Sequence, residues 1–254
     1  MEYWELILIG LAAVAAGFVN ALAGGGTLIT FPVLTAFGIP AVSANITNTI
    51  ALCPGYFGGT WAQRNDLKGQ RSRLLVLVPV AVAGGLGGGL LLLLTGEKLF
   101  RDLVPWLILF ATLLLALQPL IRRWVMKDGF IAKPGIRGYL LSIIMVLPST
   151  VYGGYFGAGL GVVLLAVLGI TQKDHIVRLN ALKQALSLAT NVAAATFFLF
   201  SDLVNWPLAL IMAACALSGG YFGGKFAGKM KPEILRGVIV AAGLAVFVLM
   251  LIKL

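Results

Sequence analysis

One lysine within a long apolar stretch of this sequence is the residue best suited to do chemistry there. Lys183 lies about two turns into the segment Ile176–Phe200, and a long run without charge follows it. A lysine inside a membrane-spanning segment costs about 3 kcal/mol on insertion scales, so such residues tend to mark substrate paths. The alternative is a lysine that reaches the membrane surface, because Lys173 and Arg178 lie just upstream.

Amide and hydroxyl side chains accompany this lysine on one face of the predicted helix. Asn180, Lys183 and Gln184 have the spacing i, i+3, i+4, which places side chains together on a helix. Ser187 and Asn191 extend the same face by further turns. A single cation surrounded by hydrogen-bond donors suits an oxyanion, so we expect this face to bind one.

A second polar group occurs in the segment Ser43–Ala62. Asn45, Asn48 and Thr49 share a face at the same spacing, and none of them carries a charge. These residues either line the same site or form hydrogen bonds between membrane helices, as Asn and Thr commonly do. The sequence leaves both interpretations open.

Two glycine clusters interrupt the apolar segments. One precedes the short piece Thr27–Phe37, and the other, which runs from residue 157 to 161, precedes Gly161–Ile170. Because glycine weakens a helix by about 1 kcal/mol relative to alanine, we predict broken helices here. The half-helix that follows each break would direct free N–H groups and a positive dipole end inward. The residues expected to bind substrate are Asn20, Gly24, Gly25, Gly26, Thr27, Asn45, Asn48, Thr49, Gly157, Gly159, Gly161, Asn180, Lys183 and Gln184.

The composition defines the elements that must hold these residues. Of 254 residues, 60% are hydrophobic and 11% are charged, whereas soluble domains have about a quarter charged residues. This excludes a soluble enzyme, a disulfide scaffold and, despite the net charge of +10, a nucleic-acid module. Stretches such as Leu74–Thr95 are apolar all round, unlike the alternating strands of a membrane β-barrel. We therefore predict an all-α multi-pass membrane protein.

A membrane helix needs about 20 apolar residues, and eight segments approach that length. The predicted spans are Trp4–Ala23, Ser43–Ala62, Leu74–Thr95, Val104–Ile121, Arg137–Tyr155, Ile176–Phe200, Leu203–Gly223 and Ile234–Ile252. Most of the 19 Lys and Arg residues lie in four stretches, which follow the second span, the fourth span, the second glycine-broken piece and the seventh span. The positive-inside rule assigns these stretches to the cytoplasm. The N-terminus is then outside, and the two broken units enter from opposite faces.

The chain also matches itself when it is shifted by 135 residues. Gly24 and Gly26 then fall on Gly159 and Gly161, and Asn45 falls on Asn180. We predict two inverted-topology repeats, 1–121 and 137–254, joined by a cytoplasmic linker, 122–136. Each repeat consists of a glycine-broken helix hairpin and three transmembrane helices. Such architecture is typical of secondary transporters with a site near the midplane; the alternative is a duplication retained only for packing.

The sequence lacks the residues that other functions need. No Asp or Glu lies in the middle of a predicted span, although cation transporters often have carboxylates there. Cys53 and Cys215 fall in apolar segments and are interpreted as packing residues. We find no catalytic set, metal-binding pattern or cofactor motif, and therefore expect neither an enzyme nor a bound cofactor.

Several motifs resemble the sulfite exporter TauE/SafE family. In the first half they are Ala23-Gly-Gly-Gly-Thr-Leu-Ile-Thr-Phe-Pro-Val-Leu, Gly38-Ile-Pro and Ala44-Asn-Ile-Thr-Asn. In the second half they are Tyr155-Phe-Gly-Ala-Gly-Leu-Gly, Arg178-Leu-Asn-Ala-Leu-Lys-Gln and Gly219-Gly-Tyr-Phe-Gly-Gly. The resemblance implies a permease of the prokaryotic cytoplasmic membrane, often an exporter, for small anions such as sulfite, sulfoacetate and other sulfonates. It also implies that the glycine turns, Asn48 and the stripe of Asn180, Lys183 and Gln184 form the substrate site.

We therefore expect a secondary transporter that exports a small sulfur-containing anion by alternating access. The alternatives are a passive anion channel, a permease for carboxylates without sulfur, and, less favoured, a membrane-embedded enzyme or scaffold. The expected partners are the anion and the lipid bilayer, without nucleic acid. The oligomeric state is left open, with a homodimer as the candidate assembly.

Overall fold

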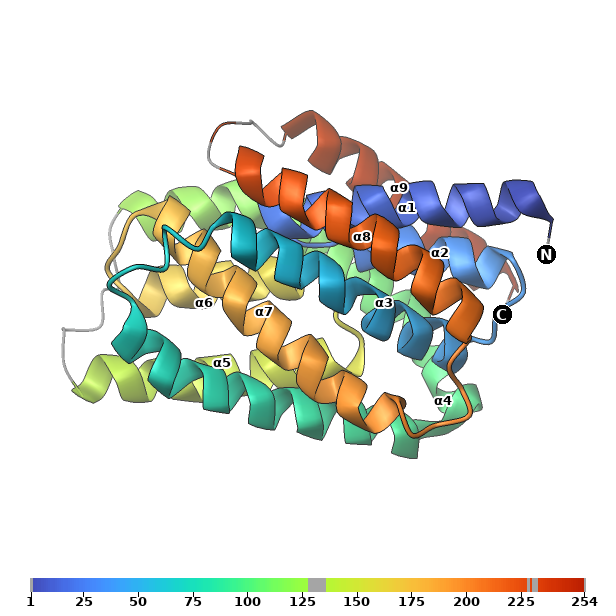
Figure 1. Ribbon diagram of the computed structural model, residues 1–254, viewed down its shortest axis with the longest axis horizontal. Coiled ribbons are helices and arrows are strands. Elements are labelled where there is room, and N and C mark those ends of the chain that lie inside the picture. Colours follow the sequence, from blue (N-terminus) through green and yellow to red (C-terminus); the bar gives the residue numbers. More distant parts are fainter. Residues whose placement is uncertain (1, 128–135, 228, 230–232, 254) are drawn as a thin grey trace.

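The computed structural model describes residues 2–127, 136–227, 229 and 233–253, and these residues form an all-helical bundle (Figure 1). The helices are α1 (Tyr3–Leu22), α2 (Thr27–Ala36), α3 (Ala41–Ala62), α4 (Arg71–Lys127), α5 (Ile136–Tyr155), α6 (Leu160–Thr171), α7 (Ile176–Phe198), α8 (Trp206–Phe226) and α9 (Glu233–Lys253). The predicted helical segments are thus confirmed, with ends that differ by a few residues.

The surface and interior of the bundle are those of a multi-pass membrane protein. Among the described residues, four helices are long and apolar enough to cross a membrane: α1, α4, α5 and α8. Large apolar side chains cover the outside, and Phe200 and Leu94 are 91% and 75% exposed. Polar side chains are instead buried on α3 and α7, which are 22 and 23 residues long. An apolar exterior around a polar interior is expected where lipid is the solvent.

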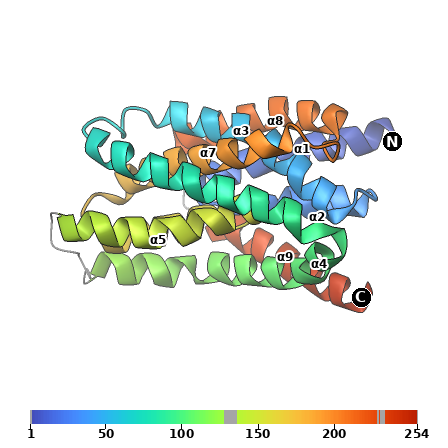
Figure 2. The ribbon, with the colours of Figure 1, turned by 90° about the horizontal axis from the view of Figure 1, so that it is seen from below.

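One connection is tighter than the sequence predicts. We expected a loop between Leu74–Thr95 and Val104–Ile121, but α4 is interrupted only at Gly96, which has φ 71° and ψ 166°. Glycine reaches this conformation without steric cost. The chain therefore folds back within one residue and forms a first arm (71–95) and a second arm (97–127) that run in opposite directions (Figures 1 and 2).

The ends of the helices gather at two ends of the bundle. The helices α3, α6 and α8 and the second arm of α4 end at one of them, where α4, α5, α7 and α9 begin (left in Figures 1 and 2). The described parts of the four basic stretches therefore lie at the same end, as the charge distribution predicts. Residues 128–135 of the expected linker lie outside the described residues.

Both glycine clusters form turns between antiparallel helix pieces, as predicted. Gly24 and Gly25 have φ of 86° and 102° between α1 and α2, and Gly157 and Gly159 have φ of 77° and 74° between α5 and α6. The first hairpin enters from the end that holds the N-terminus and returns to it, whereas the second enters from the opposite end (Figures 1 and 2). The division of the chain into two repeats and a linker stays a prediction.

Glycine-rich helices join segments that are distant in sequence. The helix α8 packs on α1 and α3, and the first arm of α4 packs on α5 and α7. A Cβ atom on Gly220 would overlap the carbonyl of Gly55, and one on Gly85 would overlap that of Thr190. The absence of a side chain at both glycines therefore allows two helix backbones to touch. The two contacts are related by the same shift of 135 residues.

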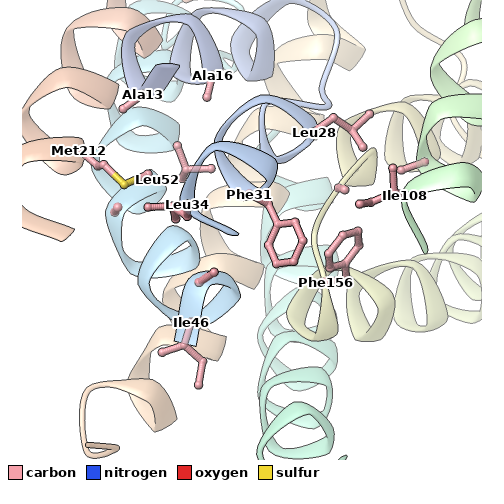
Figure 3. Close-up of a cluster of buried hydrophobic side chains, with 14 of the residues drawn as sticks. Ala13, Ala16, Leu28, Phe31, Leu34, Ile46, Leu52, Ile108, Phe156 and Met212 are labelled. Atoms are coloured by element: carbon pink, nitrogen blue, oxygen red, sulfur yellow. The ribbon is translucent and has the colours of Figure 1, made fainter. Parts of the chain in front are cut away.

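An apolar cluster surrounds the two glycine turns (Figure 3). The rings of Phe31 on α2 and Phe156, next to the second turn, meet edge to face with centroids 5.4 Å apart. Phe100 on the second arm of α4 contacts both rings and the ring of Tyr155. Phe31, Phe100 and Phe156 are at most 1% exposed, so the turns are held within a close-packed aromatic core.

Candidate functional site

The structure buries every residue predicted to bind substrate. The eight side chains other than glycine are at most 7% exposed, and the glycines of both turns are buried as well. They come from the end of α1, both turns and the starts of α2, α3, α6 and α7. The described conformation therefore encloses these polar groups on all sides.

Lys183 points at the break in the first hairpin. Its Nζ atom donates a hydrogen bond to the carbonyl of Asn20, 3.0 Å away, and the residue is 1% exposed. The side chain runs beside the start of α6, because a Cβ atom on Gly161 would lie 3.4 Å from its Cδ atom. No ion pair involves Lys183 within the described residues. A protonated lysine has three donors, and this contact uses one.

Asn180 and Gln184 lie on the same face of α7, toward α1 and α3. The amide of Asn180 donates to the carbonyl of Ala21 at 3.1 Å and to the side-chain oxygen of Gln63 at 2.7 Å. Gln184 is fully buried beside Gly59, and neither its Nε2 nor its Oε1 atom has a partner. An unpaired buried amide costs about 1–3 kcal/mol, so Gln184 has capacity for a ligand or an ordered water.

Asn20 and the two turns place further donors near this face. The Oδ1 atom of Asn20 accepts a hydrogen bond from the Gly26 backbone at 2.7 Å, and its Nδ2 atom is unpaired. The backbone N–H groups of Thr27 and Gly161, in the first turns of α2 and α6, have no acceptor among the described residues. Gly24 and Gly161 are in backbone contact. The structure therefore joins the two turns beside Lys183.

Asn48 on α3 serves a different contact. Its Oδ1 atom accepts a hydrogen bond from the Thr30 hydroxyl at 2.5 Å, and its amide donates to the Thr27 hydroxyl at 3.4 Å. Both partners lie on α2. Asn48 thus ties α3 to the half-helix, which is the interhelical role that we left open as an alternative.

Asn45 and Thr49 likewise satisfy backbone groups. Asn45 donates to the carbonyl of Tyr155 at 2.8 Å, where α5 ends, and Thr49 donates to the Asn45 carbonyl at 2.9 Å. The hydroxyl of Tyr152 donates to the carbonyl of Ala158 within the second turn at 2.6 Å. Gly157 and Gly159 contribute the backbone shape of that turn. The structure brings the predicted residues into one polar layer, with free donors concentrated on the Lys183 side.

Sequence reasoning missed three residues of this layer, Thr30, Gln63 and Gln118. Gln118 donates to the carbonyl of Ala23 at 3.2 Å, and its own Oε1 atom is buried and unpaired. A glutamine within the apolar run at the end of the fourth predicted span is a usable signal. Thr30 and Gln63 carry no comparable signal, because a threonine is ordinary in membrane helices and Gln63 follows a helix end.

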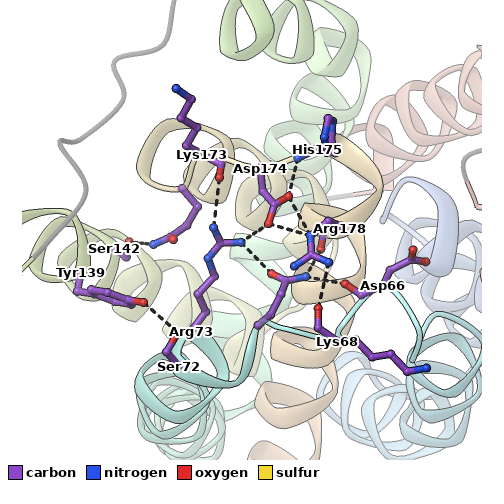
Figure 4. Close-up of polar contacts among 12 residues, drawn as sticks. Asp66, Lys68, Ser72, Arg73, Tyr139, Ser142, Lys173, Asp174, His175 and Arg178 are labelled. Atoms are coloured by element: carbon purple, nitrogen blue, oxygen red, sulfur yellow. Dashed lines mark hydrogen bonds and ion pairs between the residues drawn. The ribbon is translucent and has the colours of Figure 1, made fainter.

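A second polar cluster fastens the basic end (Figure 4). Asp174, between α6 and α7, accepts hydrogen bonds from Arg73 at 2.5 Å and from Arg178 at 2.9 Å. Burial alone would raise the pKa of Asp174, but the hydrogen bonds from Arg178 and Arg73 outweigh it and hold that pKa below its ordinary value. Arg178 also donates to the carbonyl of Lys68 at 3.0 Å. The cluster thus connects the start of α4 to the start of α7.

Comparison with known proteins gives consistent matches over nearly the whole chain. The family described as "Sulfite exporter TauE/SafE" matches residues 9–250. The chain is 26% identical to "Probable membrane transporter protein ORF9" of a Sinorhizobium species, over 99% of this chain and 94% of that protein. It is 25% identical to a "Probable membrane transporter protein" of Haemophilus influenzae, over 92% and 90%. It is 24% identical to the "Probable membrane transporter protein YfcA" of Escherichia coli, over 92% and 86%.

Proposed function

Because this chain belongs to the sulfite exporter TauE/SafE family, and is therefore a membrane transporter, we propose that it exports small sulfur-containing anions. The proposed substrates are sulfite and sulfonates such as sulfoacetate. The proposed location is the cytoplasmic membrane of a prokaryote. The N-terminal end of the bundle would face outward, because the basic stretches lie at the other end and favour the cytoplasm.

The observation that carries the proposal is that the buried Lys183 has no acidic partner among the described residues. Within the described residues its Nζ atom makes one hydrogen bond, to the neutral carbonyl of Asn20, and the residue is 1% exposed. A buried charge is costly unless a counter-charge and hydrogen bonds compensate for it. A bound anion would supply that charge, and the unpaired amides of Asn20 and Gln184 would donate to its oxygens.

Alternating access follows as the proposed mechanism. The site residues are enclosed, so an anion enters or leaves only after packed elements separate. Glycines bring backbones into direct contact where α8 meets α1 and α3 and where the first arm of α4 meets α5 and α7. We propose that the inverted repeats move against each other along these contacts and open the site to one end at a time.

The test is a ligand screen by thermal shift on purified protein, with sulfite, sulfate, thiosulfate, sulfoacetate, taurine and simple carboxylates. Lys183→Met removes the proposed counter-charge, and Lys173→Met makes the same change at an exposed position. We expect stabilisation by sulfur anions in the wild type and in Lys173→Met, and none in folded Lys183→Met. A shift with carboxylates alone would replace the substrate class, and unaltered binding in Lys183→Met would refute the site.

Reconstituted protein distinguishes a carrier from a channel. A carrier exchanges labelled external anion for unlabelled internal anion, and its rate saturates because each cycle moves the protein. A channel instead passes a current that keeps rising with driving force. We expect saturable exchange in vesicles of the wild type, and large anion currents in a planar bilayer would overturn alternating access.

A further inference from the structure

The charge of the enclosed polar layer leads to a narrower substrate class. We propose that the site accepts monovalent anions and discriminates against divalent ones of similar size. The inference rests on the proposed anion transport and deepens it. It concerns how much negative charge the protein can neutralise at the place where the anion binds.

The layer contains one charged side chain. The described residues include 21 buried polar or charged side chains, and all of them except Lys183 are Asn, Gln, Ser or Thr. The nearest ion pairs, those of Asp174, lie in the cluster at the basic end of the bundle. With Lys183 protonated, the described residues therefore bring one positive charge to the site and no negative one.

Aligning the two halves of the sequence with the shift of 135 residues identifies the position on α3 that corresponds to Lys183. The shift aligns Asn45 with Asn180 and Asn48 with Lys183. The α3 side thus has a neutral amide at the position of the lysine, and Asn48 already bonds to Thr27 and Thr30. A symmetric site would carry two ammonium groups and suit a dianion, whereas this site carries one.

Neutral donors do not change this balance. The unpaired amides of Asn20 and Gln184 and the free N–H group of Gly161 add hydrogen bonds to an oxyanion. They stabilise its oxygens but leave its net charge unaltered. A dianion would retain one negative charge without a counter-charge in a water-excluded interior, where such charges are costly. The count narrows the substrates proposed above: hydrogen sulfite and simple alkanesulfonates fit it, whereas sulfoacetate, which is doubly charged, is removed from them, and sulfate is excluded as well.

Wild-type protein can test this by calorimetric titration with methanesulfonate and sulfate, which share a sulfonyl group and differ in charge. We expect methanesulfonate to bind about 30-fold more tightly or better, a difference of about 2 kcal/mol. Equal affinities, or tighter binding of sulfate, would overturn the monovalent preference and leave anion transport standing. If neither anion, nor any other in the screen, binds to folded protein, the proposed function itself fails.

Asn48→Lys supplies the second cation, and Asn48→Met is the matched control of similar length without charge. We expect Asn48→Lys to move the preference toward sulfate by about tenfold or more, and Asn48→Met to keep the wild-type ratio. An unchanged ratio in folded Asn48→Lys would contradict the charge count. Should that variant not fold, the wild-type comparison of the two anions decides alone.

Discussion

The helices α3 and α7 make similar contacts with helix ends and glycines, and they differ in charge. Asn45 on α3 donates to the Tyr155 carbonyl, at the end of α5, and Asn180 on α7 donates to the Ala21 carbonyl, near the end of α1. Each helix also presents a backbone carbonyl to a glycine of a distant helix. Both helices therefore anchor a helix end and a glycine contact with uncharged groups.

The difference lies in the cations of α7. On α7 the cations are Arg178 and Lys183. The residues of α3 that lie 135 positions earlier in the sequence are Ser43 and Asn48. Ser43 donates to the Leu203 carbonyl at 2.6 Å, as Arg178 donates to the Lys68 carbonyl at 3.0 Å. Neutral residues thus suffice for the contacts that hold α3. This comparison favours a role for Lys183 beyond holding the end of α1, and the following variants test it.

The largest expected effect comes from making α7 resemble α3. Lys183→Asn removes the cation and keeps an amide at that position. We expect anion affinity to fall by about 100-fold, or about 3 kcal/mol, because the buried ligand loses its counter-charge. Titration of wild type and variant with methanesulfonate measures it. If the variant unfolds while anion binding per folded molecule is unchanged, the lysine has only a structural role.

The next largest effect is expected at the two glycine contacts, that of α8 with α3 and that of the first arm of α4 with α7. We expect the same loss of stability when either contact is disturbed. Gly220→Ala and Gly85→Ala each place a Cβ atom against a backbone carbonyl, and such overpacking costs about 1–3 kcal/mol. Thermal unfolding in detergent should show a lower melting temperature for both. Gly237→Ala, which has open space around it, is the control. A loss for only one of the two would show that the paired contacts are unequal.

The stabilisation by the hydrogen bonds of Asp174 with Arg73 and Arg178, at the start of α7, should depend on pH. The pKa of Asp174 is lowered, so its stabilisation is present above about pH 4, where a free aspartate ionises, and is lost as pH falls through the lowered pKa. Asp174→Asn should cost about 1–2 kcal/mol at neutral pH. Unfolding measured from pH 7 downward should show a smaller pH dependence in this variant than in exposed Asp202→Asn.

The smallest effect is expected at the start of α3. Ser43→Ala removes one neutral hydrogen bond to the Leu203 carbonyl, which is worth about 0.5–1.5 kcal/mol. The loss should not depend on pH, since neither partner titrates. Unfolding of Ser43→Ala beside Asp174→Asn compares the two ends directly. A larger loss of stability in Ser43→Ala than in Asp174→Asn would reverse the proposed order of the two contacts.

The sequence predicts the helices of this protein better than the contacts of its polar residues. Apolar length identifies the spans, and glycine clusters identify the two turns, because both signals are local. The sharp bend at Gly96 was missed, since a single glycine between apolar segments does not indicate whether the helix continues. The layer around Lys183 was predicted, but the pairing of Asn180 with Gln63 depends on how α3 and α7 meet.

The helices α1 and α3 pack on α8, which comes much later in the chain, and this has a consequence for biosynthesis. When α3 enters the membrane, neither α8 nor the carbonyl of Tyr155, which Asn45 contacts, has yet been made. The amide of Asn45 must therefore wait for its partner in lipid or in the insertion machinery, where unpaired polar groups are costly. The bundle therefore closes late, when α8 follows α7. We expect truncation before α8 to leave α1 and α3 exposed to proteolysis and membrane quality control.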